Sequence, residues 1–183
     1  MNQLITVGDK DFAPYISASQ IEESVKAIAQ SINESYSESK TPVLMLVTLS
    51  GAMMFAAELS KYVTVPLEWA FVKCSSYGVG MTSSGTVRFT VQPTVSVEGR
   101  DVLVIEDIVD TGNTWVALHS NLLEAKAASV KIATMCIKRE VYDKPLPVDF
   151  VALEIENKFI VGYGLDYGEI GRNINGIYVL ATS

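Results

Sequence analysis

The chain has 183 residues, of which 49% are hydrophobic and 19% are charged. A chain of this length can bury about 70% of its unfolded surface in one domain, so the composition predicts a globular protein and excludes a disordered one. The 21 acidic and 14 basic residues give a net charge of -7 at pH 7. This balance argues against nucleic acid or an anionic membrane as the main partner.

The two cysteines, Cys74 and Cys136, lie in apolar runs without a paired spacing. They are predicted to be buried free thiols of a reducing compartment. The N-terminus lacks a basic region followed by an apolar segment, and no apolar run approaches the ~18 residues of a membrane span. We therefore expect a cytoplasmic protein.

The first clear element is a helix ending near Tyr36, with apolar residues at Ile21, Val25, Ile28 and Ile32. Its predicted start is a capping box with Ser19 as the cap and Glu22 as the reciprocal acceptor. The patterns that follow predict further strands and helices. Strands are expected at 43–47, 67–74, 86–91, 102–105, 129–137, 148–155, 159–161 and 176–180, and helices at 52–62 and 115–126.

Serine and glycine dominate residues 75–85, a stretch that cannot bury enough apolar surface to order itself. We expect a mobile functional loop at about 75–90. Residues 2–15 give no clear prediction. Strands that alternate with helices predict an α/β fold, with a mainly parallel twisted sheet flanked by helices. Polar segments at 49–51, 107–114 and 138–139 should then meet at the carboxyl edge of that sheet.

The segment from Asp101 to Thr114 carries the strongest chemical signal. A buried strand leads into adjacent acids, a third acid, and a Thr-Gly-x-Thr turn that precedes a helix capped by Thr114 or Thr111. Such a turn suits a phosphate monoester, because backbone amides and hydroxyls can donate to it. The patterns of nucleoside-triphosphate and dinucleotide loops are absent. The adjacent acids can accept ribose hydroxyls and hold Mg²⁺.

Several segments together resemble one family. They are residues 102–114, the Ser/Gly-rich loop with Ser76 and Tyr77, the pair Lys138 and Arg139, and residues 159–172. This combination resembles the type I phosphoribosyltransferases and, within them, the hypoxanthine-guanine phosphoribosyltransferases. The resemblance implies a single domain over 1–183, with a small hood built from the termini and a base-binding segment at about 138–172. It also implies a homodimer or homotetramer.

The activity implied by the resemblance is purine salvage. The family transfers the 5-phosphoribosyl group from phosphoribosyl diphosphate to N9 of hypoxanthine or guanine, giving IMP or GMP plus pyrophosphate, with Mg²⁺ as cofactor. The resemblance assigns Asp110 as the catalytic acid or base near purine N7. It places Glu106 and Asp107 on the ribose hydroxyls and, together with Asp166, on Mg²⁺. The residues implied for the 5-phosphate are Thr111, Gly112, Asn113 and Thr114.

The remaining implied roles concern the base and the pyrophosphate. Lys138 would donate to the purine 6-oxygen, which disfavours adenine. Phe159 would stack on the base and the backbone of Ile160 would meet its 2-position. Arg172 would contact pyrophosphate. The other residues implied are Ser50 and Gly51 in the pyrophosphate loop, and Ser76 and Tyr77 closing over the reacting atoms.

Two departures from the family pattern stand out. Ser50 occupies a position where lysine or asparagine is frequent, in a turn that carries a cis peptide in the family. Asn113 replaces a lysine of some members.

The candidate site residues also have structural interpretations. These are the acids and Lys138 as solvated strand ends, Phe159 as core, Arg172 in a surface ion pair, and His119 as a helix-packing residue. Alternative functions are an RNA-binding regulator on the same fold, or transfer to another base such as xanthine.

Overall fold

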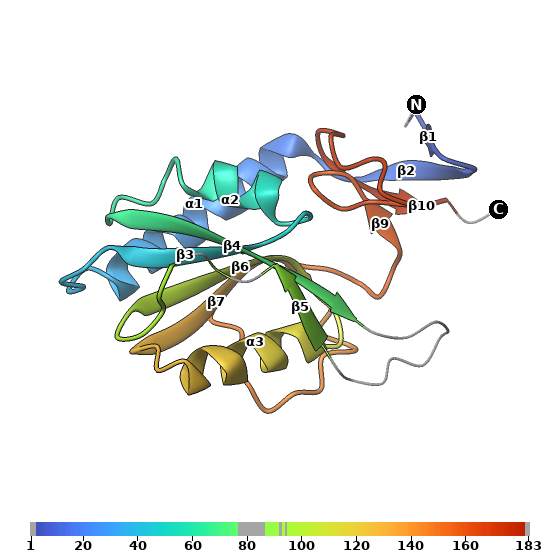
Figure 1. Ribbon diagram of the computed structural model, residues 1–183. Helices are drawn as coiled ribbons and strands as arrows, with labels where there is room; N and C mark the ends of the chain where they lie inside the picture. The colour runs from blue at the N-terminus through green and yellow to red at the C-terminus, as the bar shows by residue number, and fades with distance from the viewer. Residues whose placement is uncertain (1–2, 77–86, 92, 94, 182–183) are drawn as a thin grey trace.

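The computed structural model describes residues 3–76, 87–91, 93 and 95–181 of the chain. They form a six-stranded main sheet and a separate four-stranded sheet (Figure 1). The order in the main sheet is β5-β4-β3-β6-β7-β8, in which β5 is antiparallel and the other five strands are parallel. Its strands are β3 Val43–Thr48, β4 Leu67–Ser76, β5 Val87–Val91, β6 Asp101–Val109, β7 Ser129–Ile137 and β8 Phe150–Glu154. The predicted mainly parallel α/β fold is confirmed.

Helices cover both faces of the main sheet. The helices α1 Ala18–Ser35 and α2 Met53–Leu59 lie on one face, and α3 Asn113–Glu124 lies on the other (Figure 1). Strand β3 is buried along its whole length because its side chains alternate between the two layers. Met45 and Val47 pack with α1 and α2, whereas Leu44 and Leu46 pack with α3.

The second sheet joins the two ends of the chain in the order β1-β2-β10-β9. Its strands are β1 Ile5–Val7, β2 Lys10–Ile16, β9 Ile160–Val161 and β10 Ile177–Leu180. The fully buried Phe12 packs with Val7 and Val161 at its centre. This sheet is the hood that the family resemblance implied. Residues 5–16 become strands because β2 pairs with β10, a partner distant in sequence.

The start of α1 differs from the prediction. Ser17, not Ser19, is the N-cap: its hydroxyl accepts from the Gln20 amide at 3.3 Å, and its own amide donates to the Gln20 side chain at 3.0 Å. The capping box therefore lies two residues earlier than predicted. The predicted buried stripe, made of Ile21, Val25, Ile28 and Ile32, is confirmed. Helix α2 is shorter at both ends than the predicted 52–62.

Substitution of Ser17 tests the corrected cap. Ser17→Ala removes the acceptor for the first-turn amide and should lower the free energy of unfolding by about 1 kcal/mol. Ser19→Ala is the matched control, because Ser19 lies inside the helix and only its hydroxyl contacts Ser17. Urea denaturation followed by circular dichroism measures both variants. A larger loss for Ser19→Ala would contradict the assignment.

Candidate active site

Three turns meet at the carboxyl edge of the main sheet, as the sequence predicted. They follow β3, β6 and β7, which run parallel and adjacent. A cavity of about 240 Å³ lies at this edge. It is lined by Thr48, Leu49, Ser50, Gly51, Cys74, Glu106, Asp107, Thr114, Asp166 and Arg172. Residues 166 and 172 come from the segment between β9 and β10, so the site also includes the C-terminal part of the chain.

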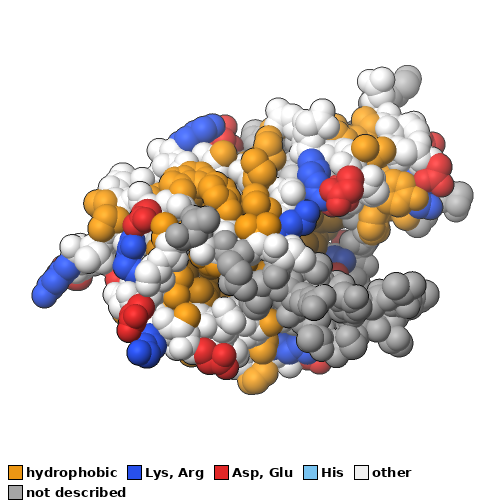
Figure 2. All heavy atoms as spheres, in the orientation of Figure 1, with side chains coloured by type: hydrophobic (Ala, Val, Ile, Leu, Met, Phe, Trp, Pro, Cys, Tyr) orange, Lys and Arg blue, Asp and Glu red, His pale blue; other side chains and the backbone are white. Residues whose placement is uncertain are grey.

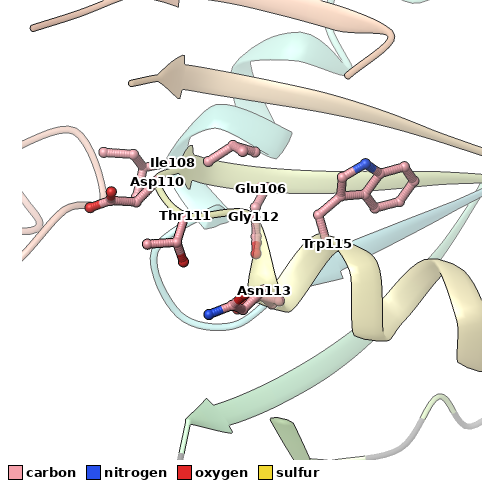
Figure 3. Close-up of a pocket in the computed structure, with 9 residues that line it drawn as sticks. Glu106, Ile108, Asp110, Thr111, Gly112, Asn113 and Trp115 are labelled. Atoms are coloured by element: carbon pink, nitrogen blue, oxygen red, sulfur yellow. The ribbon is translucent and has the colours of Figure 1, made fainter. Parts of the chain in front are cut away.

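The predicted phosphate turn forms a second, smaller hollow of about 90 Å³ next to this cavity. Figure 3 shows the turn curving from the end of β6 into α3, with Trp115 in the first turn of the helix. Gly112 is the N-cap of α3, with φ +78° and no side-chain cap. The prediction that Thr111 or Thr114 caps the helix is wrong. The first amides of α3 therefore face the hollow as donors for an anion.

Of the adjacent acids, Glu106 is buried and Asp107 is partly buried. Glu106 is 7% exposed, and its carboxyl group contacts the hydroxyl of Thr48, which also donates to the Ile105 carbonyl at 2.8 Å. Burial, reinforced by the neighbouring Asp107 charge, raises the pKa of Glu106 from its ordinary 4.5 to about 8. Burial also raises the pKa of Asp107. A solvated strand end is excluded for this pair.

Asp107 packs against glycine backbone. A Cβ atom on Gly51 would lie 1.6 Å from Asp107 Oδ2, and a Cβ atom on Gly164 would lie 2.0 Å from the Gly51 carbonyl oxygen. Side chains at either glycine would displace the acid or separate the two turns. The turn after β3 and the C-terminal segment are thus in direct backbone contact beside Asp107. Sequence reasoning missed Gly164, although its place in a Gly-x-Gly pattern was visible.

Lys138 and Asp110 form an ion pair at the end of β7. Lys138 Nζ lies 2.9 Å from Asp110 Oδ2, and Lys138 is only 9% exposed. A solvated strand end is therefore wrong for Lys138. The Asp110 side chain remains 47% exposed, so one face of the pair is open to a ligand. The pair presents a donor and an acceptor side by side.

Arg172 connects the parts of the C-terminal segment. It donates to the Gly164 carbonyl at 2.8 Å and pairs with Asp166 at 2.8 Å and Glu169 at 2.9 Å. Its position in the cavity wall, beside Asp107, shows that it is more than a surface ion pair. Arg172 can therefore hold the segment in place and still present positive charge to the cavity.

The aromatic residue predicted to stack on a base is accessible. Phe159 is 46% exposed and packs with Phe12 and Tyr167, with ring centroids at 6.2 and 5.8 Å. A role as ordinary core is therefore excluded. Ile160 follows in β9 and is buried. His119 packs edge-on against Trp115, which agrees with a helix-packing residue.

The turn after β3 has the predicted backbone: the Leu49–Ser50 peptide is cis. Ser50 and Gly51 line the cavity. Ser76 ends β4, and its side chain lies outside the described residues, as does Tyr77. The predicted mobile loop at 75–90 falls largely on residues 77–86, which also lie outside the described residues. The predicted hairpin arm is confirmed as β5, antiparallel to β4.

The donor chemistry of the cavity suits Mg²⁺ bound together with a substrate. Among the described residues, no three His, Cys, Asp or Glu side chains form a complete metal cluster. Asp107 and Asp166 both line the cavity and offer oxygen only. Mg²⁺ commonly binds through one or two carboxylates plus substrate phosphates, which this arrangement allows.

Helices of the described part of the chain are all too short or too polar to cross a membrane.

Comparison with known proteins agrees with this geometry. The family model for the phosphoribosyl transferase domain matches residues 17–168. The chain belongs to the phosphoribosyltransferase family. A hypoxanthine-guanine phosphoribosyltransferase of Streptococcus thermophilus is 43% identical over 155 residues, covering 85% of each chain. A hypoxanthine-guanine-xanthine phosphoribosyltransferase of Tritrichomonas foetus is 38% identical over 166 residues, covering 89% of this chain and 88% of the relative.

Solved structures show the same relationship. A hypoxanthine phosphoribosyl transferase of Trypanosoma cruzi superposes with a TM-score of 0.86 at 35% identity. The match covers 92% of this phosphoribosyltransferase and 90% of the Trypanosoma chain. The resemblance stated from the sequence is therefore confirmed over nearly the whole chain, and so is the fold that it implied.

Burial of Glu106 predicts a pH-dependent stability. Its pKa is raised on folding, so between pH 4.5 and about 8 the folded chain holds a proton that the unfolded chain releases. The free energy of unfolding is therefore highest, as far as Glu106 is concerned, below pH 4.5, and it falls as pH rises towards 8. Glu106→Gln should therefore raise the melting temperature of the ligand-free protein at pH 8 by several degrees, and less at pH 5.

Thermal melts across this pH range measure the effect. Glu98→Gln is the matched control, because Glu98 lies on the surface in an exposed pair with Lys126. Equal shifts for both variants at pH 8, or a destabilised Glu106→Gln protein, would contradict the prediction.

Proposed function

We propose that this phosphoribosyltransferase transfers the 5-phosphoribosyl group from phosphoribosyl diphosphate to N9 of hypoxanthine or guanine. The products are IMP or GMP and pyrophosphate, and the role is purine salvage. The observation that carries the proposal is the Lys138–Asp110 pair, at 2.9 Å, beside a phosphate turn. A 6-oxopurine presents an acceptor at O6 next to a donor at a protonated N7. The pair offers the complementary donor and acceptor.

The pair also explains the choice of base. The ammonium group of Lys138 has three donors and no acceptor, so it matches a 6-oxygen and opposes a 6-amino group. Phe159 offers its exposed ring as a stacking surface. The backbone of Ile160 would meet the 2-position, which leaves hypoxanthine, guanine and xanthine to be distinguished by measurement. The relative named for all three bases keeps xanthine open.

The proposed chemistry assigns a role to each charged group. The bond between C1′ and the pyrophosphate oxygen breaks as N9 attacks C1′, and the N7 proton passes to Asp110. Glu106 and Asp107 accept the ribose hydroxyls, and the Thr111–Thr114 turn donates to the 5-phosphate. Arg172 and the backbone of Ser50 and Gly51 receive the departing pyrophosphate. Ser76 and Tyr77 would exclude water from the cationic transition state.

Mg²⁺ is proposed as the cofactor, held by Asp107 and Asp166, with Glu106 nearby, and by substrate oxygens. When bound, it supplies positive charge that neutralises the diphosphate. The donor set of the cavity supports this assignment, because buried carboxylates with raised pKa values gain most from a neighbouring cation.

An assay of purine bases tests the function. The purified protein should convert hypoxanthine and phosphoribosyl diphosphate to IMP only when Mg²⁺ is present. Guanine should react as well, and adenine should not. The absence of turnover with hypoxanthine, guanine and xanthine would reject the proposal.

Asp110→Asn tests the proposed proton acceptor. The amide keeps the size of the side chain but cannot accept the N7 proton, so kcat should fall by roughly 100-fold or more, with KM for phosphoribosyl diphosphate changed far less. Steady-state kinetics separates the two constants. Glu98→Gln serves again as the surface control. A rise in KM at unchanged kcat would assign Asp110 to binding alone.

A nucleotide-sensing regulator that binds RNA is the alternative on this fold. The net charge of -7 gives it little support, because such binding requires a basic surface.

We propose further that residues 1–183 form one domain with a base-binding segment at about 138–172. The free thiols Cys74 and Cys136, whose pKa values burial raises to about 12, support a cytoplasmic location.

We also propose a homodimer or homotetramer. Trp69 and Phe71 pair with Met45 and Val47 in register and thus face the side of α1 and α2, yet they are 40% and 41% exposed. Met53 adds an exposed side chain at the start of α2, and Figure 2 shows hydrophobic side chains gathered on this face. An apolar surface of this kind is typical of an association site.

Light scattering tests the association. The wild-type protein should have a mass that is a multiple of the chain mass, and Phe71→Lys should shift it towards the monomer, because a buried charge opposes association. Leu123→Lys is the control, since Leu123 is 49% exposed on α3, on the opposite face of the sheet. A monomeric wild type, or a Phe71→Lys protein of unchanged mass, would contradict the proposal.

A further inference from the structure

The connection between β7 and β8 lies against the phosphate turn. Lys138 donates its amide to the Val109 carbonyl at 3.0 Å, at the end of β6. Farther along the connection, the indole of Trp115, in the first turn of α3, donates to the Pro147 carbonyl at 3.0 Å. The amide of Tyr142 donates to the Lys138 carbonyl at 3.1 Å. The connection is therefore fixed at both ends beside the Thr111–Thr114 turn.

Two side chains of this connection pack directly on Gly112. A Cβ atom built there would lie 2.4 Å from Tyr142 Cε2 and 3.1 Å from Lys144 Cγ. The aliphatic stem of Lys144 thus rests on the backbone of the phosphate turn, and the side chain is only 27% exposed. The ammonium group lies three bonds beyond Cγ, so a change of rotamer can move it relative to the turn.

Lys144 is paired with an exposed carboxylate that a ligand can readily replace. Lys144 Nζ lies 2.8 Å from Asp143 Oδ1, on the neighbouring residue, and the Asp143 side chain is 78% exposed. An exposed pair of this kind contributes little to stability and is easily exchanged. A phosphate monoester, with nearly two negative charges and strong acceptor oxygens, is a better partner for an ammonium group.

The phosphate turn itself lacks positive charge. Residues 111–114 contain no basic side chain, because Asn113 is neutral. Lys138 is bonded to Asp110, and Arg172 is bonded to Asp166 and Glu169. Lys144 approaches the turn from outside it and pairs with an exposed acid.

We propose that Lys144 binds the 5-phosphate of phosphoribosyl diphosphate and of the product nucleotide, supplying from the β7–β8 connection the charge that the Thr111–Thr114 turn lacks. On binding, Nζ exchanges the Asp143 carboxylate for a phosphate oxygen, and the stem stays on Gly112. Because the same connection begins at Lys138, it contacts the base end and the phosphate end of one nucleotide. The inference rests on the proposed function and adds a phosphate-binding residue to it.

Lys144→Met separates charge from packing, because methionine keeps an unbranched apolar stem. The variant should bind IMP about 10-fold more weakly than wild type, as expected for loss of a charged hydrogen bond. Its affinity for inosine, which lacks the phosphate, should be unchanged. Isothermal titration measures both ligands, and inosine binding also shows that the site is folded. Lys144→Arg should retain most of the IMP affinity.

Asn113→Lys in the Lys144→Met background is the decisive second variant. It restores a cation to the turn and should recover the IMP affinity without changing inosine binding. Lys126→Met is the matched control, because Lys126 pairs with Glu98 on the surface. Equal IMP affinity of Lys144→Met and wild type would overturn the inference while purine turnover stands. Equal losses for IMP and inosine would also overturn it, since they would show a packing role.

The proposed function has a separate failure. If the wild type binds neither IMP nor ribose 5-phosphate and has no turnover with any 6-oxopurine, then the function and this inference both fall.

Discussion

The placement of two adjacent carboxylates near the end of β6, one buried and one partly buried, is the constraint on which the site depends. Glu106 is almost inaccessible, and Asp107 lies against the backbone of Gly51 so closely that no side chain fits between them. The Gly51 carbonyl in turn contacts Gly164. The acid pair, the turn after β3 and the C-terminal segment are therefore held as one unit. This arrangement lowers the stability of the ligand-free protein, because charged carboxylates are unfavourable when buried without a cation.

That loss of stability is consistent with the proposed chemistry. A site that awaits a cation and a polyanionic substrate is destabilised while empty, and the binding of both relieves the repulsion between the acids. Burial also removes water from the place where charge develops, which strengthens the electrostatic interactions of the transition state. In the proposed function, the same residues thus lower the stability of the free protein and favour catalysis.

The fold divides recognition among segments that are far apart in the sequence. In the proposed function, the β6–α3 turn receives the sugar phosphate, the end of β7 receives the base edge, and the hood supplies the stacking surface through Phe159. Arg172 connects these parts, because it bonds the Gly164 carbonyl next to the turn after β3 and pairs with Asp166. The hood is therefore a wall of the site as well as the meeting place of the two termini.

Particular elements show why some sequence predictions succeeded and others did not. The buried stripe of α1 was predicted because it depends on helical periodicity alone. Its cap was misplaced because Ser17 and Ser19 are both suitable caps, and the choice depends on Ile16, where β2 ends by pairing with β10. Strand β6 continues past the acids because β7 pairs with it as far as Val109. Isolated apolar patterning predicted an earlier end.

The sequence by itself determined the alternation of strands and helices, the shared edge of three polar turns, and the acids and turn of residues 106–114 on which the proposed phosphate binding rests. Periodicity and short motifs suffice for these features, because neighbouring residues carry them. Only the tertiary structure decided the hood strands of residues 5–16, the Lys138–Asp110 pair, and the contacts of Gly51 with Gly164 and of Gly112 with Lys144. Each of these joins segments distant along the chain, and their proximity follows from sheet pairing and packing rather than from local propensity.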